Sequence, residues 1–201
     1  MKFLEFKKHF DEFNIITHQD IKNVFGELNP VQLSLWKQKG YLKSAKKGMY
    51  LLADNQIDKI LMANELNDSY ISLEFALSFY QIIPEIAQAI TSVSNNRQEV
   101  VENDFGVFYY HKITPKLFTG FTLIQSVIKN NRVIKIAEPE KALFDLIYLR
   151  TDLKTRKDFK ALRLNFDKIE IEKMSKYIKV IEAESIKKRF DNFLDYYNAS
   201  I

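Results

Sequence analysis

The order of hydrophobic periodicities along this chain constrains its fold more than any other sequence feature. Apolar residues recur at helical spacing in three segments of residues 1–53, and two short strand-like runs, YLKSA and MYLL, follow around a glycine turn. Helical spacing continues after residue 54, gives way to β-rich runs, and returns after Ala137. This order predicts an α+β fold, with one module in residues 1–53 and a second domain in residues 54–201.

The first module contains residues that are typical of the starts and ends of three helices. The first helix is predicted from aromatic residues at spacings of three and four, namely Phe3, Phe6, Phe10 and Phe13. Thr17 is a candidate N-cap for the second helix, Asn29 and Pro30 begin the third, and Gly40 ends it. Three helices followed by a β-hairpin is the order of a winged helix-turn-helix, in which the third helix enters the major groove of DNA.

The second domain is predicted to contain an antiparallel sheet of four or five strands with flanking helices. Its strand candidates are AITSVS, QEVVEN, GVFYYHKI, TLIQSVI and RVIKIA. Pro139 begins a strongly apolar helix, ALFDLIYL, and further helices cover residues 155–199. No internal repeat or long linker is visible, so the boundary near residue 54 is expected to be a hinge at most.

Positive charge is concentrated in the first quarter of the chain. Residues 1–53 hold nine Lys against five acidic residues, whereas the remaining residues hold 21 of each sign. No acidic residue occurs between Glu27 and Asp54. A one-sided cluster of this kind indicates a polyanionic partner, here double-stranded DNA. A solvated lysine face, or a winged helix that binds protein, is the alternative.

Side-chain chemistry divides the expected DNA contacts into base readers and phosphate ligands. On the third helix, Leu33 and Trp36 face the core, and the opposite side carries Val31, Ser34, Leu35 and Gln38. Ser34 and Gln38 can hydrogen-bond base edges, and Val31 and Leu35 can contact a thymine methyl. The expected phosphate ligands are Lys37, Lys39, Lys43, Lys46 and Lys47, together with Thr17, His18 and Gln19 at the start of the second helix.

Signals for catalysis are weak. The three His residues (9, 18 and 111) are far apart, and the chain has no Cys and five Gly. Glu138 and Glu140 suit the positive end of a helix dipole, and Asp145 can be an exposed polar position. We therefore expect no enzyme activity, cofactor or metal site. The sequence contains no candidate membrane span, and the absence of cysteine suits a reducing, cytoplasmic environment.

Five stretches, in this order after the predicted winged helix, resemble the AbiEi family: KKGMYLL, ISLEFALSFYQIIPE, ITSVSNNR, FYYHKI and IAEPEKALFDLIYL. These proteins are antitoxins and repressors of AbiE (type IV) toxin–antitoxin systems, which are linked to abortive phage infection. The resemblance runs from about Phe3 to about Tyr148. It implies that the N-terminal domain binds inverted repeats in its own promoter and represses the operon. It also implies that the C-terminal domain counteracts a nucleotidyltransferase-like toxin, without requiring a stable complex.

The resemblance also implies candidate residues for antitoxin function. Arg97, Lys141 and Asp145 are the polar residues at matching positions that we expect to matter. Family winged helices often carry Arg around the third helix and the hairpin, whereas this chain has only Lys there. Bidentate guanine reading by Arg is then unavailable, so base specificity would depend on Gln38 and Ser34.

Two other functions remain open from the sequence. The chain could be a winged-helix regulator whose C-terminal domain senses a ligand or forms a dimer. It could also be a nuclease that a winged helix directs to DNA. An apolar pocket with converging polar groups would favour the first, and clustered carboxylates that bind a divalent metal would favour the second.

Overall fold

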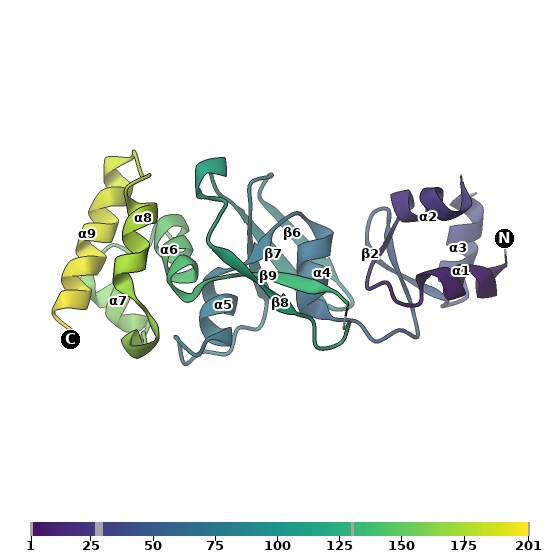
Figure 1. Ribbon diagram of the computed structural model, residues 1–201, viewed down its shortest axis with the longest axis horizontal. Coiled ribbons are helices and arrows are strands. Elements are labelled where there is room, and N and C mark those ends of the chain that lie inside the picture. The colour runs from purple at the N-terminus through teal and green to yellow at the C-terminus, as the bar shows by residue number, and fades with distance from the viewer. Residues whose placement is uncertain (1, 27–29, 130, 201) are drawn as a thin grey trace.

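The computed structural model describes residues 2–26, 30–129 and 131–200. Figure 1 shows the chain laid out in order along its long axis, with α1–α3 at one end, the larger sheet in the middle and α7–α9 at the other end. Helices and strands are mixed throughout, and the described residues form two sheets. The predicted α+β class is confirmed.

The N-terminal module contains three helices and a small sheet. Its elements are α1 (Phe3–Phe10), β1 (Ile16–Thr17), α2 (His18–Phe25), α3 (Pro30–Gln38), β2 (Leu42–Lys46) and β3 (Met49–Leu52). Within the described residues the sheet has three strands in the order β1-β3-β2, and both pairs are antiparallel. The predicted helices and hairpin are therefore present. The predicted cap Asn29 lies outside the described residues.

An aromatic cluster holds this module together. Phe6 and Phe10 of α1 are fully buried, and Trp36 of α3 packs against Phe6 with ring centroids 5.0 Å apart. Phe3 and Phe13 pack at the edge of the same cluster. Phe3, Phe6 and Phe10 thus form the core face of α1, because residues three and four apart lie on one side of a helix. Phe13 was predicted on the same helix but lies beyond its end at Phe10.

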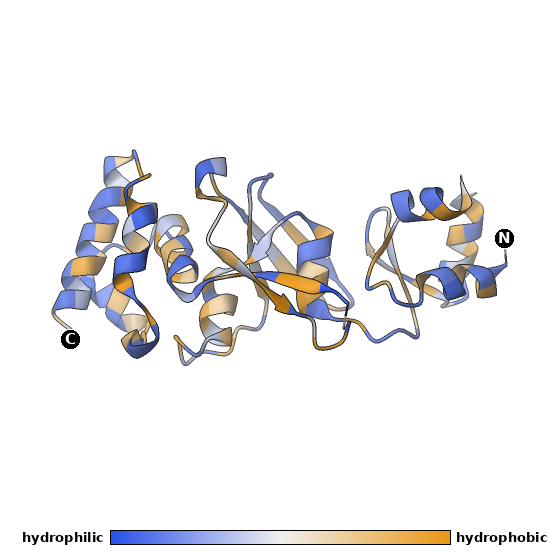
Figure 2. Ribbon diagram, viewed as in Figure 1, coloured by the Kyte–Doolittle hydropathy of each residue, from blue (hydrophilic) through white to orange (hydrophobic). Residues whose placement is uncertain are grey.

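The central domain is built on a mixed sheet. Its elements are α4 (Lys59–Leu66), β4 (Tyr70–Ile71), α5 (Leu73–Phe79), β5 (Ile90–Ser94), β6 (Glu99–Asn103), β7 (Gly106–Lys112), the 3₁₀ turn Pro115–Leu117, β8 (Phe121–Gln125) and β9 (Val133–Ala137). In the described part of the chain the sheet has six strands in the order β6-β7-β5-β4-β9-β8. Figure 2 shows the orange, hydrophobic segments of the strands and helices of this region.

The prediction of an antiparallel sheet with four or five strands is wrong. β5 pairs with β7 in parallel, and β4 pairs with β9 in parallel. The missed strand, β4, has two residues and lies directly before α5, so it has no alternating pattern of its own. Alternation also reports which face of a strand is buried and carries no information on the direction of its neighbour.

The C-terminal helices cover the far end of the sheet. They are α6 (Pro139–Leu149), α7 (Arg156–Ala161), α8 (Ser175–Ile178) and α9 (Glu184–Asn198), with 3₁₀ turns at Phe166–Lys168 and Ile171–Met174. Pro139 occupies the start of α6 as predicted. α6 is buried from Glu140 to Ile147 because it packs between α5 and α9. No helix of the described residues is long and apolar enough to cross a membrane.

Packing crosses the predicted boundary at residue 54. Ile15, Ala45 and Leu51 of the N-terminal module belong to the large hydrophobic core of the central domain. Asn14 donates to the carbonyl of Asp58 at 3.1 Å and accepts from its backbone N–H at 2.9 Å. The two predicted parts therefore share a buried interface, and residue 54 lies in the connection between β3 and α4.

Candidate functional site

The outward face of α3 is the first candidate site. Leu33 and Trp36 are buried, as the helical spacing predicts. Val31 and Leu35 are 61% and 47% exposed, and Ser34 and Gln38 are exposed beside them. The face combines two apolar groups with two groups that can hydrogen-bond. That combination can contact base edges and thymine methyl groups.

The first turn of α2 does not offer the phosphate site that the sequence predicted. The Thr17 hydroxyl is bound to Asp20 in a capping box, and the Asp20 carboxylate also accepts from the Thr17 backbone N–H at 2.8 Å. The backbone N–H of His18 donates to the carbonyl of Gly48. The backbone donors of His18 and Asp20 and the Thr17 hydroxyl are thus engaged, and the Asp20 carboxylate lies at the start of the helix, where an anion would bind.

The remaining polar groups of this turn have local partners. His18 Nε2 lies 3.0 Å from the hydroxyl of Tyr50 on β3, and Gln19 donates to Asn23 at 2.8 Å. Lys37 on α3 lies 6.0 Å from the ring of the same tyrosine. Tyr50 therefore brings the start of α2 and the C-terminal half of α3 together. His18, Gln19 and Lys37 remain exposed around it.

The wing lysines, which are those of β2 and of the turn after it, divide into two groups. Lys46 donates to Glu99 of β6 at 2.6 Å and to the carbonyl of Leu66 at 3.4 Å. Lys43 lies 5.6 Å from the ring of Phe105 in the central domain. Lys47, in contrast, is exposed and its ammonium has no partner among the described residues.

The prediction that Lys46 binds DNA phosphate is therefore corrected. Its ammonium is engaged at the domain interface, where its side chain is 26% exposed and that of Glu99 is 17% exposed. The segment appeared free of acidic groups because Glu99 lies 53 positions away in the sequence. Lys39, at the end of α3, is exposed and has no ammonium partner in the described part of the chain.

A buried polar cluster lies where the sequence predicted antitoxin residues. Lys141 and Asp145, one helical turn apart on α6, form an ion pair in which both side chains are 0% exposed. Asp145 Oδ2 accepts from the hydroxyls of Tyr70 at 2.9 Å and Ser72 at 2.7 Å. Lys141 also donates to the Tyr70 hydroxyl at 2.7 Å. We name these four residues the buried cluster.

Burial dominates the electrostatics of the buried cluster. It lowers the pKa of the Lys141 ammonium and raises the pKa of the Asp145 carboxyl, because loss of hydration outweighs their attraction. Burial also raises the pKa of the Tyr70 hydroxyl. Each charged partner is therefore tolerated only in the presence of the other.

The expectation that Asp145 is an exposed position is wrong, and Lys141 is equally inaccessible. Neither can contact another protein in this fold, so any effect on antitoxin function would act through folding. Ser72, the residue before α5, makes no cap hydrogen bond and binds Asp145 instead. Two opposite charges four residues apart within a mostly apolar helix were the sequence signal for this pair.

Arg97 is the predicted antitoxin residue that lies on the surface. It follows β5 in the connection to β6, its side chain is 82% exposed, and it lies 3.6 Å from Glu99. The structure does not bring it together with the buried cluster.

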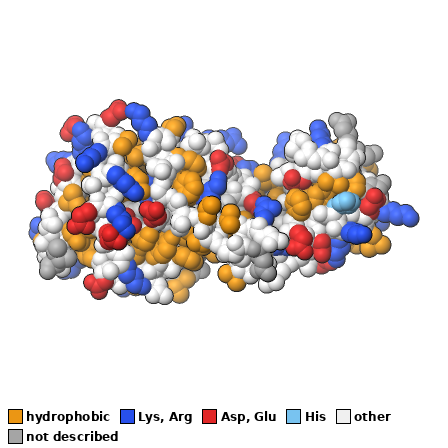
Figure 3. All heavy atoms as spheres, viewed as in Figure 1, with side chains coloured by type: hydrophobic (Ala, Val, Ile, Leu, Met, Phe, Trp, Pro, Cys, Tyr) orange, Lys and Arg blue, Asp and Glu red, His pale blue; other side chains and the backbone are white. Residues whose placement is uncertain are grey.

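Figure 3 shows acidic and basic side chains interspersed over the central and C-terminal parts of the face that it draws.

The carboxylates near the start of α6 do not converge. Glu140 is buried and accepts from the backbone N–H of Glu170 at 3.0 Å, and Asp145 belongs to the buried cluster. Among residues 2–26, 30–129 and 131–200, no group of three or more His, Asp or Glu side chains is placed to hold a metal ion. The nuclease alternative gains no support from the described residues.

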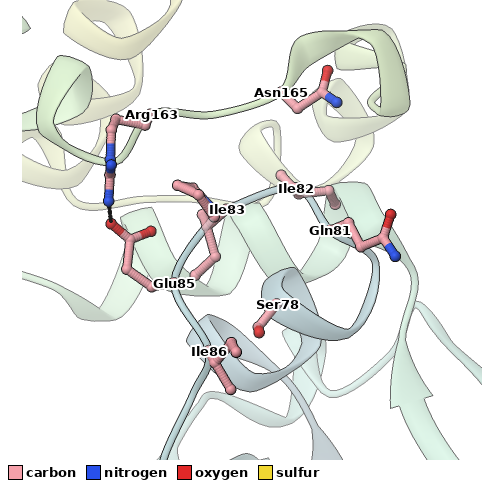
Figure 4. A pocket seen from close by; sticks show the side chains of 9 residues that line it. Ser78, Gln81, Ile82, Ile83, Glu85, Ile86, Arg163 and Asn165 are labelled. Carbon is pink, nitrogen blue, oxygen red and sulfur yellow. Dashed lines mark hydrogen bonds and ion pairs between the residues drawn. The ribbon is translucent and has the colours of Figure 1, made fainter.

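A hollow of about 390 Å³ lies between the segments that follow α5 and α7 (Figure 4). Gln81 and Arg163 line it, and both adopt left-handed backbone conformations just after a helix, with φ of 57° and 50°. Figure 4 shows Arg163 reaching Glu85, with which it forms an ion pair. Ile83 and Ile86 add apolar lining. The hollow is mixed in polarity and could hold a small ligand.

Comparison with known proteins adds no relative to this description. No protein-family model matches the chain, and no curated protein matches it.

Proposed function

We propose that the chain is a DNA-binding repressor whose N-terminal module is a winged helix-turn-helix and whose residues 54–201 act as an antitoxin. The observation that carries the first half is the outward face of α3. It exposes Val31, Ser34, Leu35 and Gln38 together, on a helix with no acidic residue. The second half rests on the resemblance to the AbiEi family.

The arrangement of the module supports the DNA-binding proposal. The order of α1, β1, α2, α3, β2 and β3, with β1-β3-β2 in the sheet, supports the proposal of a winged helix-turn-helix module. In such modules the third helix lies in the major groove. Here α3 leaves its outward face open to solvent, so a duplex could approach it without rearrangement of the module.

Base reading on this helix would depend on few groups. Gln38 can form a bidentate hydrogen bond to adenine, and the Ser34 hydroxyl can bond to several bases. Val31 and Leu35 can exclude water from a thymine methyl. Exposed apolar side chains cost free energy in water, and a base contact would recover part of that cost.

Phosphate contacts would come from the cations without protein partners. Lys39 at the end of α3 and Lys47 at the hairpin turn are the strongest candidates, followed by Lys37 beside Tyr50. Lys43 lies against Phe105 and has less freedom to reach a phosphate. This distribution predicts an affinity that depends on salt through a small number of phosphate contacts.

Substitution of Gln38 tests the proposal. Gln38→Ala should weaken binding to DNA from the chain's own promoter by about 1–3 kcal/mol, and should change binding to random DNA much less. Gln125→Ala is the matched control, because Gln125 is equally exposed but lies on β8 of the central domain. Fluorescence anisotropy with labelled duplexes measures both affinities. Equal losses on the two duplexes would show that α3 does not read sequence.

Arg97 tests the antitoxin half, since it is the exposed member of the predicted set. Arg97→Glu should reduce protection of cells from the nucleotidyltransferase-like toxin and leave promoter repression unchanged. Arg156→Glu is the control, because Arg156 is also exposed but lies on α7. Full protection by the Arg97 variant at equal protein level would remove Arg97 from this role.

The ligand-sensing alternative is favoured by one specific observation, the hollow beside Gln81 and Arg163. A regulator of this kind would bind DNA with an affinity that changes when a small molecule occupies the hollow. Introducing a larger side chain with Ser78→Trp would fill part of it, since Ser78 lines the hollow from α5. A DNA affinity that responds to a metabolite mixture in the wild type but not in this variant would favour the alternative.

A further inference from the structure

A second hollow, at the C-terminal end of the molecule, has a distinct chemistry. It has a volume of about 430 Å³ and lies between the segment after α6 and the first half of α9. Its lining residues are Thr151, Lys154, Ser185, Lys188, Arg189 and Asn192. The four residues from α9 are spaced by three, one and three positions, which places them on one face of the helix. We name this hollow the basic pocket.

The charge of the basic pocket has one sign. Three lining side chains are cationic and none is acidic. The ammonium groups of Lys154 and Lys188 are exposed and have no hydrogen-bond or ion-pair partner among the described residues. Because both lysines line the same hollow, an anion bound there would be attracted by two ammonium groups of like charge.

Two acidic groups near the pocket, Asp152 and Glu184, are already paired with other cations. Asp152 forms two hydrogen bonds with Arg150, at 2.8 and 2.6 Å. Glu184 forms an ion pair with Lys187 at 2.7 Å. Neither carboxylate lines the basic pocket, so neither neutralises the two lysine ammonium groups directly.

Arg189 contributes a buried guanidinium with a fixed position to the basic pocket. The residue is only 8% exposed, and its Nη1 donates to the carbonyls of Ile147 at 2.7 Å and Tyr148 at 3.0 Å. These bonds tie the guanidinium to the C-terminal end of α6. Burial lowers the pKa of Arg189 because hydration of its charge is lost. The charge of Asp152 offsets part of that loss, and a bound anion would add to this compensation.

We infer that the basic pocket binds a small phosphomonoester, a molecule with a terminal phosphate dianion. Thr151 and Ser185 supply hydroxyl groups beside the three cations, and the Asn192 amide, which donates to the carbonyl of Lys154 at 2.9 Å, ties the two sides of the pocket together. Hydroxyls and cations together suit the several oxygens of one phosphate. A terminal phosphate can enter a hollow, whereas the phosphodiesters of a duplex run along a broad convex surface and would meet only the exposed lysines. This site is independent of the proposed DNA-binding face, because it lies at the opposite end of the molecule (Figure 1).

Calorimetry with the full chain tests the inference, using adenosine monophosphate, inorganic phosphate, adenosine and a 12-nucleotide single-stranded DNA without terminal phosphates. The wild type should bind adenosine monophosphate and inorganic phosphate at one site and should not bind adenosine. Lys154→Ala/Lys188→Ala should weaken both phosphate ligands by at least about tenfold, because two charge-assisted contacts are lost. Both lysines are exposed, so the fold should be unchanged.

The control and the remaining outcomes separate a pocket from a general charge effect. Lys157→Ala/Lys160→Ala removes the same charge from exposed positions of α7 outside the pocket and should leave phosphate affinity unchanged. An equal loss in this control, or no phosphate binding by the wild type, would overturn the inference. If the oligonucleotide bound more tightly than adenosine monophosphate and lost as much affinity in the pocket variant, the site would bind nucleic-acid backbone and the inference would be wrong.

Discussion

The buried ion pair between Lys141 and Asp145 predicts strong energetic coupling between the two residues. We consider Lys141→Met, Asp145→Asn and the double variant. Either single change leaves one charge in a site that is 0% exposed. Removing one partner of such a pair costs about 3–5 kcal/mol of unfolding free energy, because the other charge has lost its compensation.

The double variant should be more stable than either single variant. It buries no charge, and the amide oxygen of Asn at position 145 can still accept from the hydroxyls of Tyr70 and Ser72, which both bind Asp145 Oδ2. We expect the double variant to cost about 1–2 kcal/mol, the size of one or two imperfectly replaced hydrogen bonds. The coupling free energy of the cycle is then about 4 kcal/mol or more.

Urea unfolding at pH 7.5, followed by far-ultraviolet circular dichroism, measures these free energies. Trp36, the single tryptophan, lies in the N-terminal core, so its fluorescence reports that core separately. The control cycle uses Lys135 and Asp68, an exposed pair 2.8 Å apart, for which about 1 kcal/mol or less is expected. If the double variant of the buried pair lost the sum of the single losses, the reasoning from desolvation would be refuted.

Three further predictions concern the wing, a close backbone approach and the response to pH. Lys47→Ala should make the dependence of log DNA affinity on log salt shallower by about 0.9, whereas Lys46→Ala should not; equal changes in anisotropy titrations would contradict the assignment of Lys46 to the domain interface. Gly120→Ala should cost about 1–3 kcal/mol more than Gly26→Ala in urea unfolding. The two glycines share φ near 78°, but a Cβ at Gly120 would clash with the buried hydroxyl of Tyr177, whereas a Cβ at Gly26 would meet no atom of the described residues within 4 Å. Burial lowers the pKa of His111 below its usual 6.5, so the unfolded chain binds the proton more tightly and stability falls as pH drops through that value; His111→Gln should lose less stability between pH 7.5 and 5.5 than the wild type.

Much of the secondary structure follows from local sequence patterns. The phenylalanine stripe predicted the buried face of α1, and Pro139 marked the start of α6. The same spacing argument separated Leu33 and Trp36 from the exposed side of α3. These predictions succeed because helical periodicity and capping depend on residues within about one turn of each other.

The sheet was harder to predict because strand pairing is non-local. β5 and β7 are parallel neighbours although β6 lies between them in sequence, and β4 is too short to show alternation. An alternating run indicates a strand with one buried face, but partner and direction depend on the whole arrangement.

The candidate sites also depend partly on local sequence and partly on the tertiary structure. The sequence by itself determined which side chains α3 exposes and where positive charge is concentrated, because both follow from composition and helical spacing. Only the tertiary structure decided that Lys46 binds Glu99, that Lys141 and Asp145 are buried together, and that Lys154 and Lys188 converge on one hollow. The physical reason is that burial and charge pairing depend on groups brought together from distant parts of the chain, and their desolvation and Coulomb energies do not exist until the chain has folded.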